Sequence, residues 1–330
     1  MTSELLSAPD NVNSIVCLGG GHGLFQTLRA ARCLRFPEIK AIVTVADDGG
    51  SSGRIRRELG HIPPGDLRMA LCALARDDDE GELWENVLQH RFGGTGALAG
   101  HAVGNLLISG LTDVLGSETE ALDAVARLTR SYGRVIPMCP QPLDIEAEVA
   151  GLADDPRIMR MLRGQVAIAT TPGEVRRVRL IPEQPAASPE ALEAIANADL
   201  ITLGPGSWFS SVIPHLLVPE IVEAISSARA LRVVVLNLSN TQLETTGFSM
   251  ERHIHMLLQH APGLRVDRVL VDKASPIDST DLTHLERAAA SMGAMIVVDD
   301  VREYASDGLG TERHSPEKLA QSLVRLCQNR

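Results

Sequence analysis

A cluster of glycines beside a histidine stands at the end of the first apolar run, and such residues can bind a phosphate. The run SIVCL leads into Gly20, Gly21, His22 and Gly23, and an amphipathic stretch follows. Glycine N–H groups can approach a phosphate closely, and a helix N-terminus adds partial positive charge. Leu24 stands where a dinucleotide fingerprint needs its third glycine, and no Lys-Ser/Thr pair follows as in a Walker loop. A tight turn is the alternative, but four glycines in five positions exceed its needs, so the cluster predicts anion binding.

An acidic and serine-rich loop follows the second apolar run. Asp47 and Asp48 lead through two glycines into Ser51, Ser52 and Arg54. The two carboxylates could hold Mg²⁺, one could act as a base, or one could accept a ribose hydroxyl, while a loop capped by Asp is the structural alternative. The loop also fits G-x-S-x-G, but two aspartates intervene and the match falls very early, so we do not predict a hydrolase.

A second glycine loop and two helix starts add further candidates. Gly204-Pro205-Gly206-Ser207 follows another apolar run, and loops at the carboxyl ends of parallel strands face one cleft, although a plain turn would look alike. Asp66 is placed to accept first-turn N–H groups after Pro63 and Pro64, and Arg68 could meet a ligand or form a salt bridge. His101 and Asn105 open another helix. Asn105 could bind a base or a hydroxyl, or be a buried amide paired with backbone.

Composition excludes several partner classes. The 330 residues include 31 Lys and Arg against 42 Asp and Glu, a net charge of −11, which disfavours binding to duplex DNA. Nine aromatics leave few platforms for stacking on single strands. No apolar run reaches the length of a membrane span, and the N-terminus lacks the regions of a signal peptide. Five scattered cysteines without C-x-x-C spacing argue for reduced thiols, so a cytoplasmic location is expected.

Arginine makes up 28 of the 31 basic residues, and the three lysines lie outside the glycine loops. Compositional bias explains most of this. Any phosphate must nevertheless be bound by backbone amides and selected arginines, with Arg54, Arg68 and Arg313 as the ones to test.

The elements that must position these residues alternate between strand and helix, which indicates a doubly wound, mainly parallel Rossmann-like α/β fold. We expect one domain over residues 12–330, with a helical insertion at about 63–131 and a small extended excursion after it. Strands are expected at 14–18, 40–46, 134–138, 145–151, 165–170, 174–181, 200–203, 232–236, 266–271 and 294–298. Helices are expected at about 24–34, 250–260 and 282–290, and from Pro316 onward after Ser315 as N-cap.

With these residues laid out, the chain resembles the CofD-like superfamily, and within it the gluconeogenesis-factor (YvcK-like) branch. The resemblance runs from about Asn13 to the final helix and rests on LGGGHGL, VTVADDGGSSGRIR, PPGDLRMAL, GHAVGN, ADLITLGPGSWFSSVIPHLLVP, NLSNTQLETTGF and RHSPEKL. VTVADDGGSSGR followed by PPGDLR is highly specific. The GHGL and GHAVGN variants look most like actinobacterial members.

The resemblance implies a nucleotide-bearing ligand in the cleft, and in this branch a UDP-sugar such as UDP-N-acetylglucosamine. Gly20, Gly21, His22 and Gly23 would take the diphosphate. The cleft would be lined by Asp47, Asp48, Ser51, Ser52, Asn105, Gly206 and Ser207. Phe248 matches a position linked to UDP-sugar binding and would stack on uracil, while Arg313 would meet the diphosphate or a sugar oxygen. In this chain, His22 replaces a common Thr, Phe248 a usual Tyr, and Gln242-Leu243 a common Pro-Gly.

Two functions follow from the resemblance. The first is a regulatory factor that binds a nucleotide sugar and supports growth and cell shape on gluconeogenic carbon sources, through partners in cell-wall synthesis. The second is a phospholactyl-type transferase with a nucleotide-activated donor, as in coenzyme F420 synthesis, using Asp47 or Asp48 with Mg²⁺. Related folds suggest a homodimer.

Overall fold

The computed structural model describes residues 8–9, 11–155, 158–238, 248–275 and 279–328. Its central sheet has the order β10-β9-β8-β7-β1-β2-β3, and every neighbouring pair is parallel. The strands are β1 (Ser14–Gly19), β2 (Glu38–Val43), β3 (Arg134–Pro137), β7 (Leu200–Leu203), β8 (Leu231–Val235), β9 (Arg268–Asp272) and β10 (Met295–Asp299). The central strands β1 and β7 are buried along their whole length, as expected for parallel strands covered on both faces.

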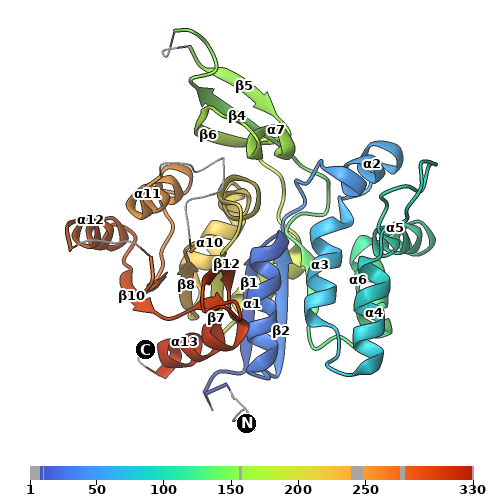
Figure 1. Cartoon of the computed structure of the whole chain (residues 1–330), viewed down its shortest axis with the longest axis horizontal. Helices are drawn as coiled ribbons and strands as arrows, with labels where there is room; N and C mark the ends of the chain where they lie inside the picture. Colours follow the sequence, from blue (N-terminus) through green and yellow to red (C-terminus); the bar gives the residue numbers. More distant parts are fainter. Residues whose placement is uncertain (1–7, 10, 156–157, 239–247, 276–278, 329–330) are drawn as a thin grey trace.

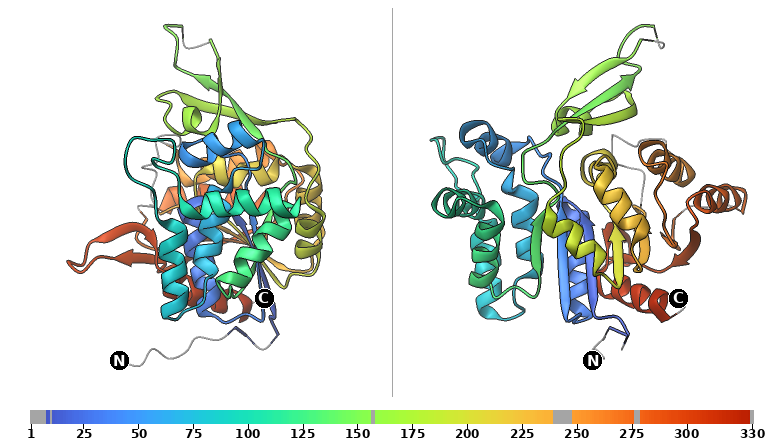
Figure 2. Two further views of the ribbon diagram at one scale, coloured as in Figure 1. Left: turned by 90° about the vertical axis from the view of Figure 1, so that its right-hand side faces the viewer. Right: turned by 180° about the vertical axis from the view of Figure 1, so that it is seen from behind.

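The strand order reverses between β1 and β7. From β1 the chain moves to β2 through α1 (Gly21–Cys33), and from β7 it moves the opposite way to β8 through α10 (Pro219–Ser227). Right-handed crossovers place these two helices on opposite faces of the sheet (Figures 1 and 2). The carboxyl ends of β1 and β7 therefore lie at the switch point, where doubly wound folds bind their ligands.

Five helices fill the segment between β2 and β3. They are α2 (Gly50–Leu59), α3 (Pro64–Leu74), α4 (Asp79–Gln89), α5 (Val103–Leu115) and α6 (Glu118–Leu128). α3 packs against α1 and the sheet, and α4, α5 and α6 pack around it at one side of the molecule (Figure 1). Ser117 caps α6, and Asp78 caps α4 by accepting a hydrogen bond from the Gly81 N–H.

A small antiparallel sheet stands above the carboxyl edge of the main sheet (Figure 1). It consists of β4 (Asp144–Ala150), β5 (Arg160–Arg163) and β6 (Glu174–Ile181) in the order β5-β4-β6, with the short α7 (Gln165–Ala169) beside it. We call these four elements the lobe. The remaining elements belong to the C-terminal half: α8 (Pro189–Ala196), the π-helical turn η1 (Trp208–Val212), α9 (Ile213–Leu216), α11 (Met250–His260), α12 (Ser279–Ala290), the hairpin β11 (Arg302–Tyr304) with β12 (Gly310–His314), and α13 (Pro316–Gln328).

The predicted fold class is confirmed, and two local predictions are wrong. The loop after Asp48 turns into helix α2 within three residues, because Gly50 adopts φ +45° and redirects the chain. Residues 165–170 contain helix α7 instead of a strand; Asp48, 118 positions away, accepts a hydrogen bond from the Val166 N–H (3.1 Å) at its first turn. The β11–β12 hairpin and strand β5 were not anticipated.

Among the described residues, no single helix is long and apolar enough to cross a membrane. The segments Trp208–Leu216 and Pro219–Ser227 pass a test of length and composition only as a pair, with a bend of 74° between them.

Candidate functional site

The two glycine loops touch each other at the switch point. A Cβ on Gly23 would lie 2.1 Å from the Pro205 carbonyl oxygen and 2.7 Å from the Gly206 Cα, so the first turn of α1 packs directly on the second loop. Thr27 Oγ1 donates to the Gly204 carbonyl (3.4 Å). Asn237, just beyond β8, donates from Nδ2 to the Gly206 carbonyl (2.8 Å) and accepts from the Gly206 N–H (2.9 Å). The expected single cleft is therefore bounded by both loops and by Asn237.

The N-terminus of α1 is suited to an anion. Gly20, its N-cap, has an extended conformation and no side chain, and its first turn contains no acidic residue, although the Gly21 N–H donates to Asp66 of α3. Gly21 has φ +56° and open space where a side chain would be, and His22 is exposed. The partial positive charge of a helix N-terminus favours an anion here.

A pocket of about 130 Å³ opens beside this helix end. It brings His22 and Gly23 together with Gly206, Asn237 and Arg313. Arg313 is exposed, and no ion pair involves it among the described residues. Residues 290 positions apart thus line one pocket, as the resemblance implies.

Two carboxyl groups lie behind the glycine loop. A Cβ on Gly20 would lie 2.4 Å from Asp66 Oδ2, and one on Gly65 would lie 3.1 Å from Asp47 Oδ2. Burial, and then the negative charge of Asp47, raise the pKa of Asp66 to about 7, although Asp66 accepts from the Gly21 N–H. Burial also raises the pKa of Asp47, against hydrogen bonds from the Gly49 N–H and Ser52. Near neutral pH the Asp66 carboxyl is therefore partly protonated and can donate to an anion.

The raised pKa of Asp66 predicts a specific pH dependence of stability. The folded state binds the Asp66 proton more tightly than the unfolded state does. The resulting contribution to the free energy of unfolding is complete below pH 3.8 and is lost as the pH rises through about 7. We expect Asp66→Asn to gain stability relative to the wild type between pH 4 and 8, measured by urea unfolding. The same change at the exposed Asp154 should give a difference that does not grow with pH. A constant difference for Asp66→Asn would contradict the assignment.

Asp47 and Asp48 face different elements. Asp48 Oδ1 accepts from the Val166 N–H of the lobe, and Asp48 Oδ2 lies 2.1 Å from where a Gly164 Cβ would be. Asp47 turns toward Gly49 and Ser52 instead. No group of three acidic, His or Cys side chains suited to a metal occurs within the described ranges, so a Mg²⁺ ion at Asp47 and Asp48 stays a prediction.

Four other predicted residues form one buried polar network. Arg68 donates from a terminal nitrogen to Asn105 Oδ1 (3.1 Å), Asn105 Nδ2 donates to Ser51 Oγ (3.0 Å), and Ser51 Oγ lies 3.0 Å from His101 Nδ1. Because the hydroxyl has one proton and two lone pairs, Ser51 can either donate to Nδ1 or accept from it, depending on the imidazole tautomer. Burial and the nearby Arg54 lower the pKa of His101 and favour its neutral form. The network connects α2, α3 and α5. The side-chain amide of Asn105 is thus hydrogen-bonded to other side chains, and not to the backbone groups expected for a buried structural amide.

The remaining predicted residues have local roles in the structure. Arg54 donates to the Ala99 carbonyl (2.7 Å), and Ser207 caps η1 by accepting from the Ser210 N–H. Phe248 is only 2% exposed, packs edge-to-face on Phe209, and has the Arg252 guanidinium 3.9 Å above its ring. In this arrangement the ring lies in the core and offers no open face for a base, so its stacking on uracil stays a prediction.

Comparison with known proteins identifies relatives over nearly the whole chain. The family model described as 2-phospho-L-lactate transferase CofD matches residues 15–313. A protein of Mycobacterium leprae named "Putative gluconeogenesis factor" is 55% identical over 96% of this chain and 86% of its own length. A protein of Listeria innocua named "Gluconeogenesis factor" is 33% identical over 96% of both chains.

A solved structure supports the same relationship. A crystal structure of a member of the UPF0052 family from Bacillus halodurans superimposes with a TM-score of 0.80 and 34% identity. The alignment covers 94% of this chain and 99% of that one.

Proposed function

The chain belongs to the CofD family, in its gluconeogenesis-factor branch, and we propose that it binds a UDP-sugar, with UDP-N-acetylglucosamine as the expected ligand. In this proposal the protein is a regulatory factor. Partners in cell-wall synthesis would bind its ligand-bound state, and this interaction supports growth and cell shape on gluconeogenic carbon sources.

The observation that carries the proposal is the contact between the two glycine loops at the switch point. The N-terminus of α1 would take the diphosphate, because the backbone N–H groups that follow Gly21 and the helix dipole supply the positive charge that a Walker lysine supplies elsewhere. Gly206, fixed by Asn237, brings a second stretch of backbone to the same place.

Arg313 supplies the side-chain charge for this site. It lines the same pocket as His22 and Gly23, and an arginine can form two parallel hydrogen bonds to a phosphate. His22 adds a second donor where a hydroxyl is common in the branch. The partly protonated Asp66 reduces the repulsion that a second carboxylate behind the loop would cause.

Calorimetry with UDP-N-acetylglucosamine tests this proposal. We expect binding by the wild type and an affinity about 10-fold weaker or worse for Arg313→Ala, because a charge-assisted hydrogen bond contributes about 1.5–3 kcal/mol. Arg127→Ala, an exposed arginine on α6, is the matched control and should bind as the wild type does. Absence of heat with millimolar ligand, or equal loss in both variants, would reject the proposal.

The match to the transferase family model favours a second function, transfer of a phospholactyl group. In that case, mixing a guanosine diphosphate-activated lactate donor with the deazaflavin alcohol and Mg²⁺ should release GMP. No release by a protein that binds the UDP-sugar would favour the regulatory factor. Release that depends on Mg²⁺ would favour the transferase.

A further inference from the structure

The β11–β12 hairpin brings Arg313 to the pocket, and little apolar packing holds the hairpin in place. It projects from the body of the molecule in Figure 2. Tyr304 and Leu309 are 43% and 69% exposed, and residues 304–310 are all exposed. Only the two ends, Val301 and His314, are buried. Polar contacts therefore contribute strongly to the position of Arg313, which precedes the buried His314.

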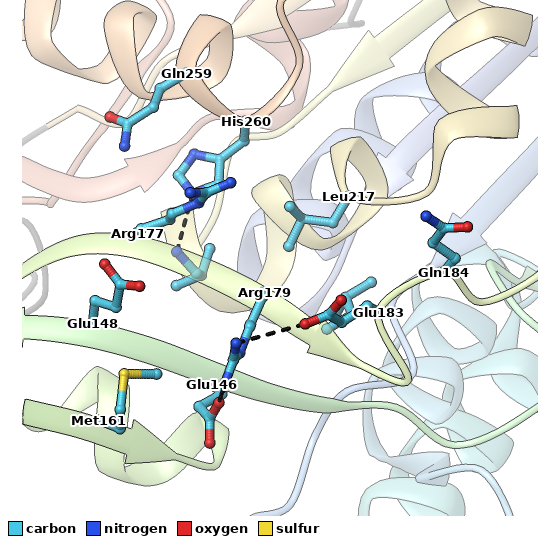
Figure 3. Close-up of a pocket in the computed structure, with 12 residues that line it drawn as sticks. Glu146, Glu148, Met161, Arg177, Arg179, Glu183, Gln184, Leu217, Gln259 and His260 are labelled. Atoms are coloured by element: carbon cyan, nitrogen blue, oxygen red, sulfur yellow. Dashed lines mark hydrogen bonds and ion pairs between the residues drawn. The ribbon is translucent and has the colours of Figure 1, made fainter.

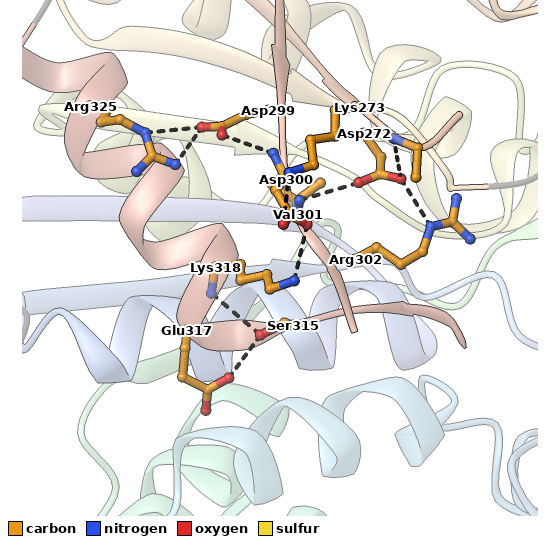
Figure 4. A network of polar contacts seen from close by, with 11 residues as sticks. Asp272, Lys273, Asp299, Asp300, Val301, Arg302, Ser315, Glu317, Lys318 and Arg325 are labelled. Atoms are coloured by element: carbon orange, nitrogen blue, oxygen red, sulfur yellow. Dashed lines mark hydrogen bonds and ion pairs between the residues drawn. The ribbon is translucent and has the colours of Figure 1, made fainter. Parts of the chain in front are cut away.

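Arg302 makes three of these contacts, beside hydrogen bonds from the Val301 N–H to Asp272 and between His314 and the Leu236 backbone. Arg302 donates from Nε to Asp272 Oδ2 (2.9 Å), and from its two terminal nitrogens to the Leu238 carbonyl (2.8 Å) and the Thr311 carbonyl (3.1 Å). Figure 4 shows Arg302 beside Asp272 at the carboxyl end of β9. The three acceptors come from the segment after β8, from β9 and from the hairpin itself.

Two of these acceptors adjoin the pocket directly. Leu238 lines it and follows Asn237, which is bonded to Gly206. Thr311 precedes Glu312 and Arg313, which also line it. Arg302 itself is not among the lining residues, so its effect on a ligand must pass through the residues it holds.

The contact between Arg302 and Asp272 is well protected. The Asp272 side chain has no exposed surface and that of Arg302 is 13% exposed. Asp272 also accepts from the N–H groups of Val301 (3.3 Å) and Ala274 (3.2 Å), so both carboxylate oxygens are occupied. A shielded pair with planar geometry fixes direction as well as distance, which a flexible lysine cannot reproduce.

We infer that Arg302 is a positioning residue of the ligand site, which sets the place of Arg313 by joining the hairpin to Asp272 and Leu238. This inference rests on the proposed function. It assigns Arg302 a role in ligand affinity that passes through Arg313.

Two other pockets of the molecule give weaker evidence for a binding site. The pocket of about 400 Å³ between the lobe and α11 is lined by the lobe's own pairs, such as Arg179 with Glu146 and with Glu183 (Figure 3). Such a ladder of opposite charges is typical of a solvated sheet face. The groove beside α10 that includes Leu216 and Val222 has no feature that identifies an occupant.

A double-mutant cycle tests the inference. We expect Arg302→Lys and Arg313→Ala each to weaken UDP-N-acetylglucosamine binding about 10-fold, and the double variant to be no weaker than Arg313→Ala alone. Additive losses, about 100-fold together, would show that Arg302 does not act through Arg313 and would overturn the inference.

Hydrogen exchange separates this outcome from a failure of the proposed function. In Arg302→Lys without ligand, amides 302–314 should exchange faster than in the wild type, while Arg325→Lys, a change in the exposed neighbouring pair with Asp299, should leave them unchanged (Figure 4). Unchanged exchange in Arg302→Lys would overturn the positioning role even if no ligand bound. Faster exchange with no UDP-sugar binding by the wild type would reject only the proposed ligand.

Discussion

Replacing Gly23 by alanine is expected to destabilise the protein by about 3 kcal/mol and to weaken UDP-sugar binding at least 10-fold. The added Cβ would lie 2.1 Å from the Pro205 carbonyl oxygen and 2.5 Å from its carbon. Both neighbours are backbone atoms, so no side chain can rotate away and one of the two loops must shift. That shift would separate the surfaces that the proposed diphosphate site needs.

Gly110 provides a matched control for this change. It also lies within a helix, α5, and a Cβ there would meet nothing within 4 Å. Gly110→Ala should therefore be neutral or stabilise the protein by about 0.5–1 kcal/mol, the helix preference of alanine over glycine. Urea unfolding and calorimetry measure both effects. If the free energy of unfolding of Gly23→Ala lay within 0.5 kcal/mol of the wild-type value, the two loops would not be in contact.

The sequence predicted the fold where local chemistry and tertiary structure agree. The β-branched runs gave the parallel sheet, and the glycines after β1 and β7 gave the switch point. Helix α2 was missed because glycine and serine are typical of turns. A single residue with positive φ, Gly50, is nevertheless enough to redirect the chain into a helix. α7 was missed because its cap, Asp48, comes from 118 positions earlier, which no local pattern reveals.

For the candidate site, residue types were predictable and partners were not. Ser51, His101, Asn105 and Arg68 were each singled out from the sequence. Their hydrogen bonds join positions 37 to 54 apart, and only the packing of α2, α3 and α5 makes them one network. Asn237 was missed, but a signal existed: it follows a strand at the same carboxyl edge as both glycine loops.

The network also changes the interpretation of Arg68. The sequence left open a ligand contact or an ordinary salt bridge; the structure shows a hydrogen bond to an amide, and a ligand contact stays a prediction. Arg68 is 4% exposed, and its one hydrogen bond is to the neutral Asn105 amide. Its Nε has no acceptor within the described part of the chain, and the carboxyl groups of Asp66 and Asp47 act on it only through space. A buried cation so sparsely paired depends strongly on its one partner.

Asn105→Leu is therefore expected to cost about 3 kcal/mol of folding free energy. Leucine has a similar size but leaves the buried Arg68 guanidinium without its acceptor and removes the donor to Ser51. Asn105→Asp instead gives Arg68 a carboxylate. Its free energy of unfolding should lie within about 1 kcal/mol of the wild-type value, because the new charge-assisted hydrogen bond to Arg68 offsets the lost hydrogen bond to Ser51. Asn86→Leu, at an exposed position of α4, is the control and should change stability by less than about 0.5 kcal/mol. Urea unfolding of the three variants decides the matter. Equal losses in Asn105→Leu and Asn105→Asp would mean that the amide is needed for its shape and for Ser51 alone, and that the charge of Arg68 is balanced elsewhere.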